Sequence, residues 1–118
     1  MTDLKPALLT ALSALPACAA VSFAREEIPL PVIVIADESG GVLAQADGTP
    51  VLEEYLFAVN VYAASPEAAE SLAIQADAAL TALGLRCTQR QGLYDEEAYA
   101  WRKYLRYRAV LKGDAIYQ

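Results

Sequence analysis

The sequence contains no histidine, only two cysteines and a single methionine. These low counts limit the kinds of catalytic and metal-binding site that the protein can form. Without histidine, the commonest general base and the commonest metal ligand are missing, and so are the Ser-His and Cys-His pairs of nucleophilic enzymes. Cys18 and Cys87 lie far apart in the chain, without the short spacing of a metal site or a redox motif. We therefore expect no enzymatic activity, no catalytic residue, no metal site and no cofactor.

The sequence also lacks the signals of a phosphate-binding loop, of a pair of catalytic carboxylates and of a membrane span. No glycine-rich phosphate loop is present, because Gly40-Gly41 alone indicates a turn. The adjacent carboxylates Glu53 and Glu54 would point to opposite faces of a strand, so they cannot act together on one substrate. No apolar run approaches the roughly 20 residues that cross a bilayer, so we expect no membrane partner.

The length and the charge indicate a single acidic domain. The chain has 118 residues, a mass of 12.6 kDa and a net charge of −6. A chain of this size is expected to keep about 6,200 Å² of accessible surface when folded, which leaves enough buried area for one core over residues 1–118. An acidic protein is not an obvious nucleic-acid binder, so we expect no sequence-specific contact with nucleic acid.

Hydrophobic periodicity predicts two helices and five strands. We expect helices over residues 3–15 and 66–83, the second capped by Ser65, with Pro66 at its first position and Gly84 beyond its end. Strands are expected over residues 18–24, 31–37, 51–63, 85–94 and 100–112. The order α-β-β-β-α-β-β predicts an α+β fold: one mainly antiparallel sheet with two helices packed on one face.

Two connections carry turn signals. The connection over residues 25–30 is short and contains Pro29. Both features predict a hairpin or a tight corner between the first two strands. Residues 38–50 hold Gly40-Gly41 and Asp47-Gly48, which predict a loop or a small hairpin extension. The segment 42–46 between these turn signals could form a short strand.

Charge is divided unevenly along the chain. Residues 1–84 hold two basic residues against eleven acidic ones, a net charge of −9, whereas residues 85–118 hold seven basic residues against four acidic ones, a net charge of +3. Strand alternation is expected to put a group of basic side chains and one tyrosine on a single face of the sheet: Arg86, Arg90, Arg102, Tyr104, Arg106 and Arg108. This face could pair with Glu54 on a neighbouring strand, remain solvated, meet an acidic partner or contact nucleic acid.

Several segments together resemble a known family. They are the helix "LLTALSAL", the strand "EEYLFAVNVYAAS" that runs directly into the helix "PEAAESLAIQADAALTAL", and the closing strand pair "LRCTQRQGLYDEEAYAWRKYLRYRAVL". In this order they resemble the tail-terminator (tail-completion, neck) proteins of long-tailed bacteriophages. The likeness covers nearly the whole chain, but it rests on the order of elements, so no functional residue transfers one by one.

The resemblance implies a structural virion protein of the tail or neck, assembled in the host cytoplasm. It implies a homo-oligomeric ring, usually a hexamer, that caps the tail tube, meets the tail tube protein and the head connector or completion protein, and could let phage DNA pass through. The segment 38–50, with Glu38 and Asp47, is similar in placement to loops that make ring or neck contacts. A ring uses heterologous interfaces, which suits opposite charges on two parts of one chain.

These considerations predict a subunit interface made of Arg86, Arg90, Arg102, Tyr104, Arg106, Arg108, Glu38 and Asp47. Two other functions are compatible with the same sequence. One is another head–tail completion protein or a minor capsid subunit, and the other is a small non-viral dimeric module that binds a ligand or peptide on its open sheet.

Overall fold

The computed structural model describes residues 4–15, 19–21, 30–96, 99–112 and 115–116. These residues form two helices and six strands: α1 (Lys5–Ser13), β1 (Ala19–Val21), β2 (Val32–Ala46), β3 (Thr49–Ala63), α2 (Pro66–Ala82), β4 (Arg86–Asp95), β5 (Ala100–Lys112) and β6 (Ala115–Ile116). The predicted order is confirmed, and β6 is an additional short strand that the sequence did not predict. Cys18 and Pro29 lie outside the described residues.

The strands form one sheet in the order β1-β2-β3-β5-β4, and β6 pairs with β5 off this path. Every pair is antiparallel except β1 with β2, which run parallel over Val32–Val34 of β2. A hairpin joins antiparallel strands, so the hairpin alternative for residues 25–30 is wrong. The connection itself, over residues 22–29, lies outside the described residues.

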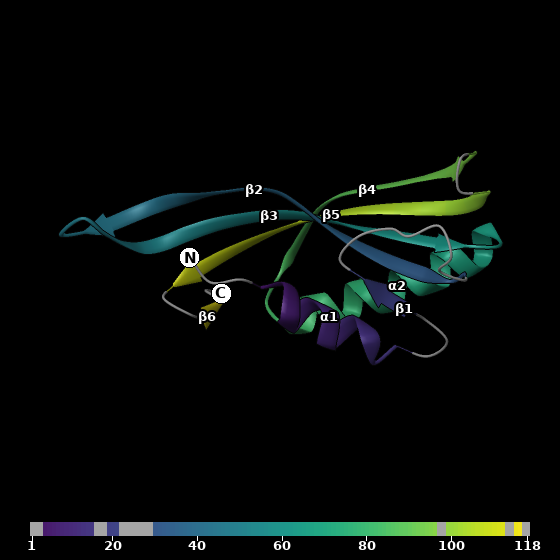
Figure 1. Ribbon diagram of the computed structural model, residues 1–118, viewed down its shortest axis with the longest axis horizontal. Coiled ribbons are helices and arrows are strands. Elements are labelled where there is room, and N and C mark those ends of the chain that lie inside the picture. Colours follow the sequence, from purple (N-terminus) through teal and green to yellow (C-terminus); the bar gives the residue numbers. More distant parts are fainter. Residues whose placement is uncertain (1–3, 16–18, 22–29, 97–98, 113–114, 117–118) are drawn as a thin grey trace.

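Both helices cover the same face of the sheet, as predicted (Figure 1). Alternate residues of the central strands point toward them, because side chains along a strand alternate between the two faces. One continuous core joins both helices to this face. The helical side contributes Leu4, Leu8, Leu12, Leu72, Ala73, Ala76 and Leu80. The sheet contributes Ile33, Ile35, Tyr55, Phe57, Val59, Val61, Leu105, Tyr107, Ala109 and Leu111. The opposite face carries no helix within the described chain.

Local signals in the sequence define both ends of α2. Ser65 is the N-cap, and its hydroxyl accepts a hydrogen bond from the Ala68 amide at 3.1 Å, with Pro66 following. At the other end Gly84 has φ +95°, a conformation that favours glycine, and its amide donates to the Thr81 carbonyl. The Leu85 amide donates to the Leu80 carbonyl, and both leucines are buried, which completes a Schellman motif.

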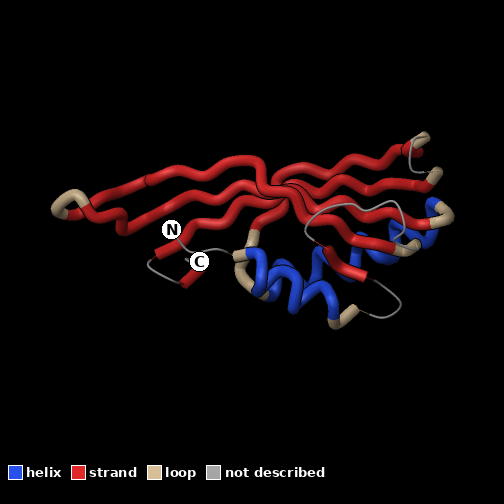
Figure 2. The backbone as a smooth tube through the Cα atoms, viewed as in Figure 1, coloured by secondary structure: helices blue, strands red, loops and turns tan. Residues whose placement is uncertain are grey.

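The largest departure from the predicted fold is the hairpin of β2 and β3. Each strand has 15 residues, so residues 38–50 continue both strands instead of forming a loop, and the hairpin extension is much longer than predicted. Asp47 and Gly48 close it as a two-residue turn, both with positive φ, as a type I′ turn requires. Figure 2 shows the two strands continuing beyond the helices up to this turn. We call residues 38–53 the arm.

The arm makes the molecule long. Its principal extents are 51 × 25 × 23 Å and its radius of gyration is 15.0 Å, against about 13.5 Å for a typical domain of this length. The accessible surface of 6854 Å² likewise exceeds the roughly 6,200 Å² expected. The excess surface belongs to elements that protrude from the core.

Candidate functional site

The predicted basic face is present on β5. In the register with β3, Arg102 lies opposite Tyr62, Tyr104 opposite Asn60, Arg106 opposite Ala58 and Arg108 opposite Leu56. These four side chains therefore point away from the helices, and each is half-buried. Their shared face is confirmed, whereas their role at a subunit interface stays a prediction.

Two of these arginines bind groups on the neighbouring strand. The Arg102 Nε donates to the buried Asn60 Oδ1 at 2.8 Å, and its guanidinium lies about equally far from the rings of Tyr62 and Tyr104, at 6.0 and 5.8 Å. The Arg108 Nε pairs with the Glu54 carboxylate. The intramolecular alternative, pairing with Glu54, is thus correct for Arg108, and these contacts stiffen the open face.

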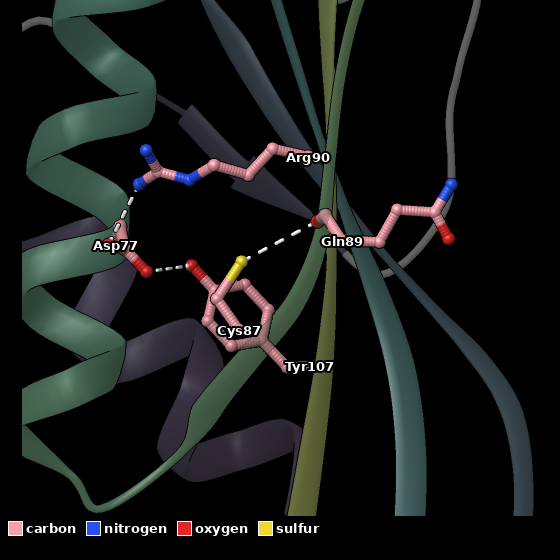
Figure 3. Close-up of polar contacts among 5 residues, drawn as sticks. All are labelled: Asp77, Cys87, Gln89, Arg90 and Tyr107. Atoms are coloured by element: carbon pink, nitrogen blue, oxygen red, sulfur yellow. Dashed lines mark hydrogen bonds and ion pairs between the residues drawn. The ribbon is translucent and has the colours of Figure 1, made fainter.

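The sheet face predicted for Arg90 is wrong, whereas its role at a subunit interface stays a prediction. Arg86 lies opposite Arg108 on the open face, but the register shifts between Cys87 and Gln89, where one extra residue, Thr88, forms a bulge. Beyond it the alternation is reversed, so Gln89 lies opposite Arg106 and Arg90 opposite the core residue Leu105. Figure 3 shows Gln89 pointing away from α2 and Arg90 pointing toward it.

Side-chain hydrogen bonds hold the bulge. The Cys87 thiol contacts the Gln89 carbonyl at 3.5 Å (Figure 3), and the Thr88 hydroxyl donates to the Arg106 carbonyl at 3.3 Å. Thr88 and Cys87 thus satisfy carbonyls next to the shift. Regular alternation cannot anticipate such a shift, because it assumes one residue on each strand per rung of the ladder.

The reversed alternation creates a polar cluster between α2 and the sheet. Tyr107 is fully buried, and its hydroxyl donates to Asp77 Oδ1 at 2.7 Å, while Arg90 binds Asp77 Oδ2 at 2.9 Å (Figure 3). Burial first, and then the hydrogen bond to Asp77, raise the pKa of Tyr107 above its ordinary value of 10.0. The cluster fastens α2 to β4 and β5. The sequence did carry a signal for this cluster: Asp77 comes directly after Ala76, which is one of the buried residues on the apolar stripe of α2.

A groove of about 210 Å³ opens beside this cluster, between α2 and the strands β4 and β5. Lys103, the exception in the apolar pattern of β5, crosses it to bind Glu70 at 2.6 Å. That hydrogen bond and the charge of Lys103 lower the pKa of Glu70. The charged groups of the groove, Glu70, Arg90 and Lys103, therefore hold the helix to the sheet.

The arm carries the two acidic residues predicted for the interface. Asp47 lies in its exposed terminal turn, and Glu38 lies in β2 at a shift of register between Asp37 and Ser39. Figure 1 shows this turn at one end of the long axis, and the last residues of β4 and the first residues of β5 at the other. Within one molecule, the structure does not bring the arm's turn to the basic strands.

An exposed apolar group at the far end of β4 and β5 was missed by the sequence analysis. Tyr94 and Trp101 make an edge-to-face contact with centroids 5.1 Å apart, and both are exposed. Leu93 and Tyr99 beside them in the chain are exposed as well, Tyr99 by 81%. Trp101 lies on the helix side of β5, in alternation with Leu105 and Tyr107, yet it is 37% exposed.

Known proteins give no further guide to the site. Comparison with protein families and with curated proteins finds no match to this chain. Among the described residues, no group of three or more acidic, cysteine or histidine side chains could hold a metal ion. No helix in the described part of the chain is long and apolar enough to cross a membrane.

Proposed function

We propose that this chain is a structural virion protein that forms a ring, caps a phage tail tube and joins it to the head connector. The observation that carries the proposal is the arm, which extends beyond the helices. Where their burial is described, the residues of the arm are exposed or half-buried, among them Leu43, which is 49% exposed. A hairpin that extends both strands beyond the helices, with an exposed leucine on it, is best explained by contact with another chain.

The charge distribution supports the same assignment. Residues 37–53, which include the whole arm, contain four acidic residues and no basic one, while β4 and β5 together carry seven basic residues and one acidic residue. Opposite charges on different elements of one molecule favour head-to-tail association, because each copy offers both partners. The element order that resembles tail terminators points to a ring built in this way.

Electron microscopy of the purified chain, and of virions that contain it, tests the proposal. We expect closed rings of uniform diameter, and in virions we expect an antibody against the chain to label the junction of head and tail. Labelling of the capsid shell would instead assign it to the minor capsid proteins. A compact dimer without rings would favour a small binding module and would contradict the proposal.

A further inference from the structure

Two bulges interrupt the arm at the same level, one on each strand. Between Val42 and Ala44 the register with β3 shifts by one residue, which leaves Leu43 as the extra residue of β2. At the next rung the register shifts back, and Val51 is the extra residue of β3. A bulge disrupts the hydrogen-bond ladder and bends its strand. Because the two bulges are adjacent, both strands of the arm lose their regular pairing at one place.

The turn at the end of the arm does not require this interruption. On the core side of the bulges Val42 lies opposite Glu53, and on the turn side Gln45 lies opposite Pro50. Two residues on each strand separate these rungs, so regular pairing would connect the same rungs without any bulge. The two shifts therefore cancel in register, and what they add is a local break in the ladder.

The break lies where the third strand of the sheet ends. β3 pairs with β5 without a shift from Ala63 to Leu52, and Lys112, opposite Leu52, is the last residue of β5. Figure 1 shows β2 and β3 continuing past this end. The bulge at Glu38 is different, because at its level β3 is continuous and also pairs with β5. Only the paired bulges at Leu43 and Val51 thus stand at the boundary between three strands and two.

Beyond the bulges the hairpin is regular again. Asp47 and Gly48 form the type I′ turn, and the two rungs next to it are in register. Gln45, Asp47 and Gly48 are all exposed, so these residues provide no packing that would fix the direction of the hairpin. Residues 45–50 therefore form a small ordered unit that is connected to the sheet through two bulged strands.

We propose that the paired bulges at Leu43 and Val51 are a joint, about which residues 45–50 turn as one unit while the rest of the arm keeps its place in the sheet. Such a joint lets the end of the arm meet a partner surface at a range of angles without breaking its own ladder. The joint is a property of the single subunit. Its use in contact between copies rests on the proposed ring.

Distances between spin labels on either side of the joint test the proposal. Gly41 and Gln45 are both exposed, one before the bulges and one beyond them, and space is open where a Cβ on Gly41 would lie. Each is replaced separately, as Gly41→Cys or Gln45→Cys, and paired with Gln89→Cys at an exposed position of β4. The background carries Cys18→Ser and Cys87→Ser, so that only the chosen positions are labelled.

Double electron–electron resonance on the free subunit gives the two distance distributions. We expect the distribution from Gln45 to be about twice as wide as that from Gly41, which is the matched control on the sheet side of the joint. Equal widths would overturn the inference, whether or not the chain assembles into rings.

Removal of both bulges gives the second arm of the test. Deleting Leu43 and Val51 together leaves Val42 with Glu53, Ala44 with Leu52 and Gln45 with Pro50 as consecutive rungs of one regular ladder. We expect the distribution from Gln45 to narrow to the width of that from Gly41. A distribution from Gln45 that stays wide in a folded deletion variant would show that the bulges are not the joint. Circular dichroism and an unchanged distribution from Gly41 establish that the variant is folded.

Discussion

At the scale of single residues, two buried tyrosines form a natural pair for comparison. Both Tyr107 and Tyr55 lie on the helix side of the sheet, but only the Tyr107 hydroxyl has a partner, Asp77. The Tyr55 hydroxyl is buried without a hydrogen-bond partner in the described structure. We expect Tyr107→Phe to lower the free energy of unfolding by about 1–2 kcal/mol, since it leaves Asp77 without that bond.

Tyr55→Phe is the matched control, because it removes the same atom from a site where the atom bonds to nothing. We expect it to be neutral or slightly stabilising. Urea unfolding of the two variants beside the parent gives both values. Equal losses would show that the bond between Tyr107 and Asp77 contributes no more than ordinary packing of a phenol.

The same tyrosine makes stability depend on alkaline pH. The folded state raises the pKa of Tyr107 above 10.0, mainly through burial, so the fold holds this proton more tightly than the unfolded chain does. Its stabilising contribution is therefore complete below about pH 10 and falls as pH rises further. We expect the free energy of unfolding to fall more steeply between about pH 10 and 12 in the parent than in Tyr107→Phe. Parallel curves would contradict this assignment.

At the scale of elements, the sequence predicted what local chemistry controls. Ser65, Pro66 and Gly84 marked α2 correctly because caps depend on residues close in the chain, and alternation assigned Phe57 and Arg102 to their faces because β3 and β5 are regular. Arg90 was misplaced because the bulge at Thr88 depends on bonds to β5. Gly40-Gly41 suggested a turn but continue β2, since pairing with β3 overrides a weak local preference.

The arm also carries a prediction about dynamics. Residues 43–51 extend past the end of β5, where β3 pairs with β5 only from Leu52 onward, so their hydrogen bonds lack cover from a third strand. We expect their amides to exchange quickly in a free subunit and slowly in the assembly, while the amides of Phe57 to Val61 are protected in both. Hydrogen exchange read by mass spectrometry distinguishes the two states. Equal exchange of the arm in both would argue against its role in contact.

At the scale of the whole molecule, one long sheet combines an acidic arm with the basic strands β4 and β5. Basic residues on the open face do not by themselves imply assembly, because within the subunit Arg108 already pairs with Glu54 and Arg102 already donates a hydrogen bond to Asn60. Each copy carries both an acidic arm and basic strands, and this favours head-to-tail contact between copies. Attraction between exposed charges is screened by salt, so association should weaken as ionic strength rises.

The mass of the purified chain in solution tests the central claim most directly. Native mass spectrometry over a range of protein concentrations at low salt should give one dominant species at a fixed whole-number multiple of the 12.6 kDa subunit, six in the arrangement expected. A closed ring predicts that this multiple does not grow with concentration, because no edge remains free. A chain that remains a monomer or stops at a dimer at every concentration would contradict the account.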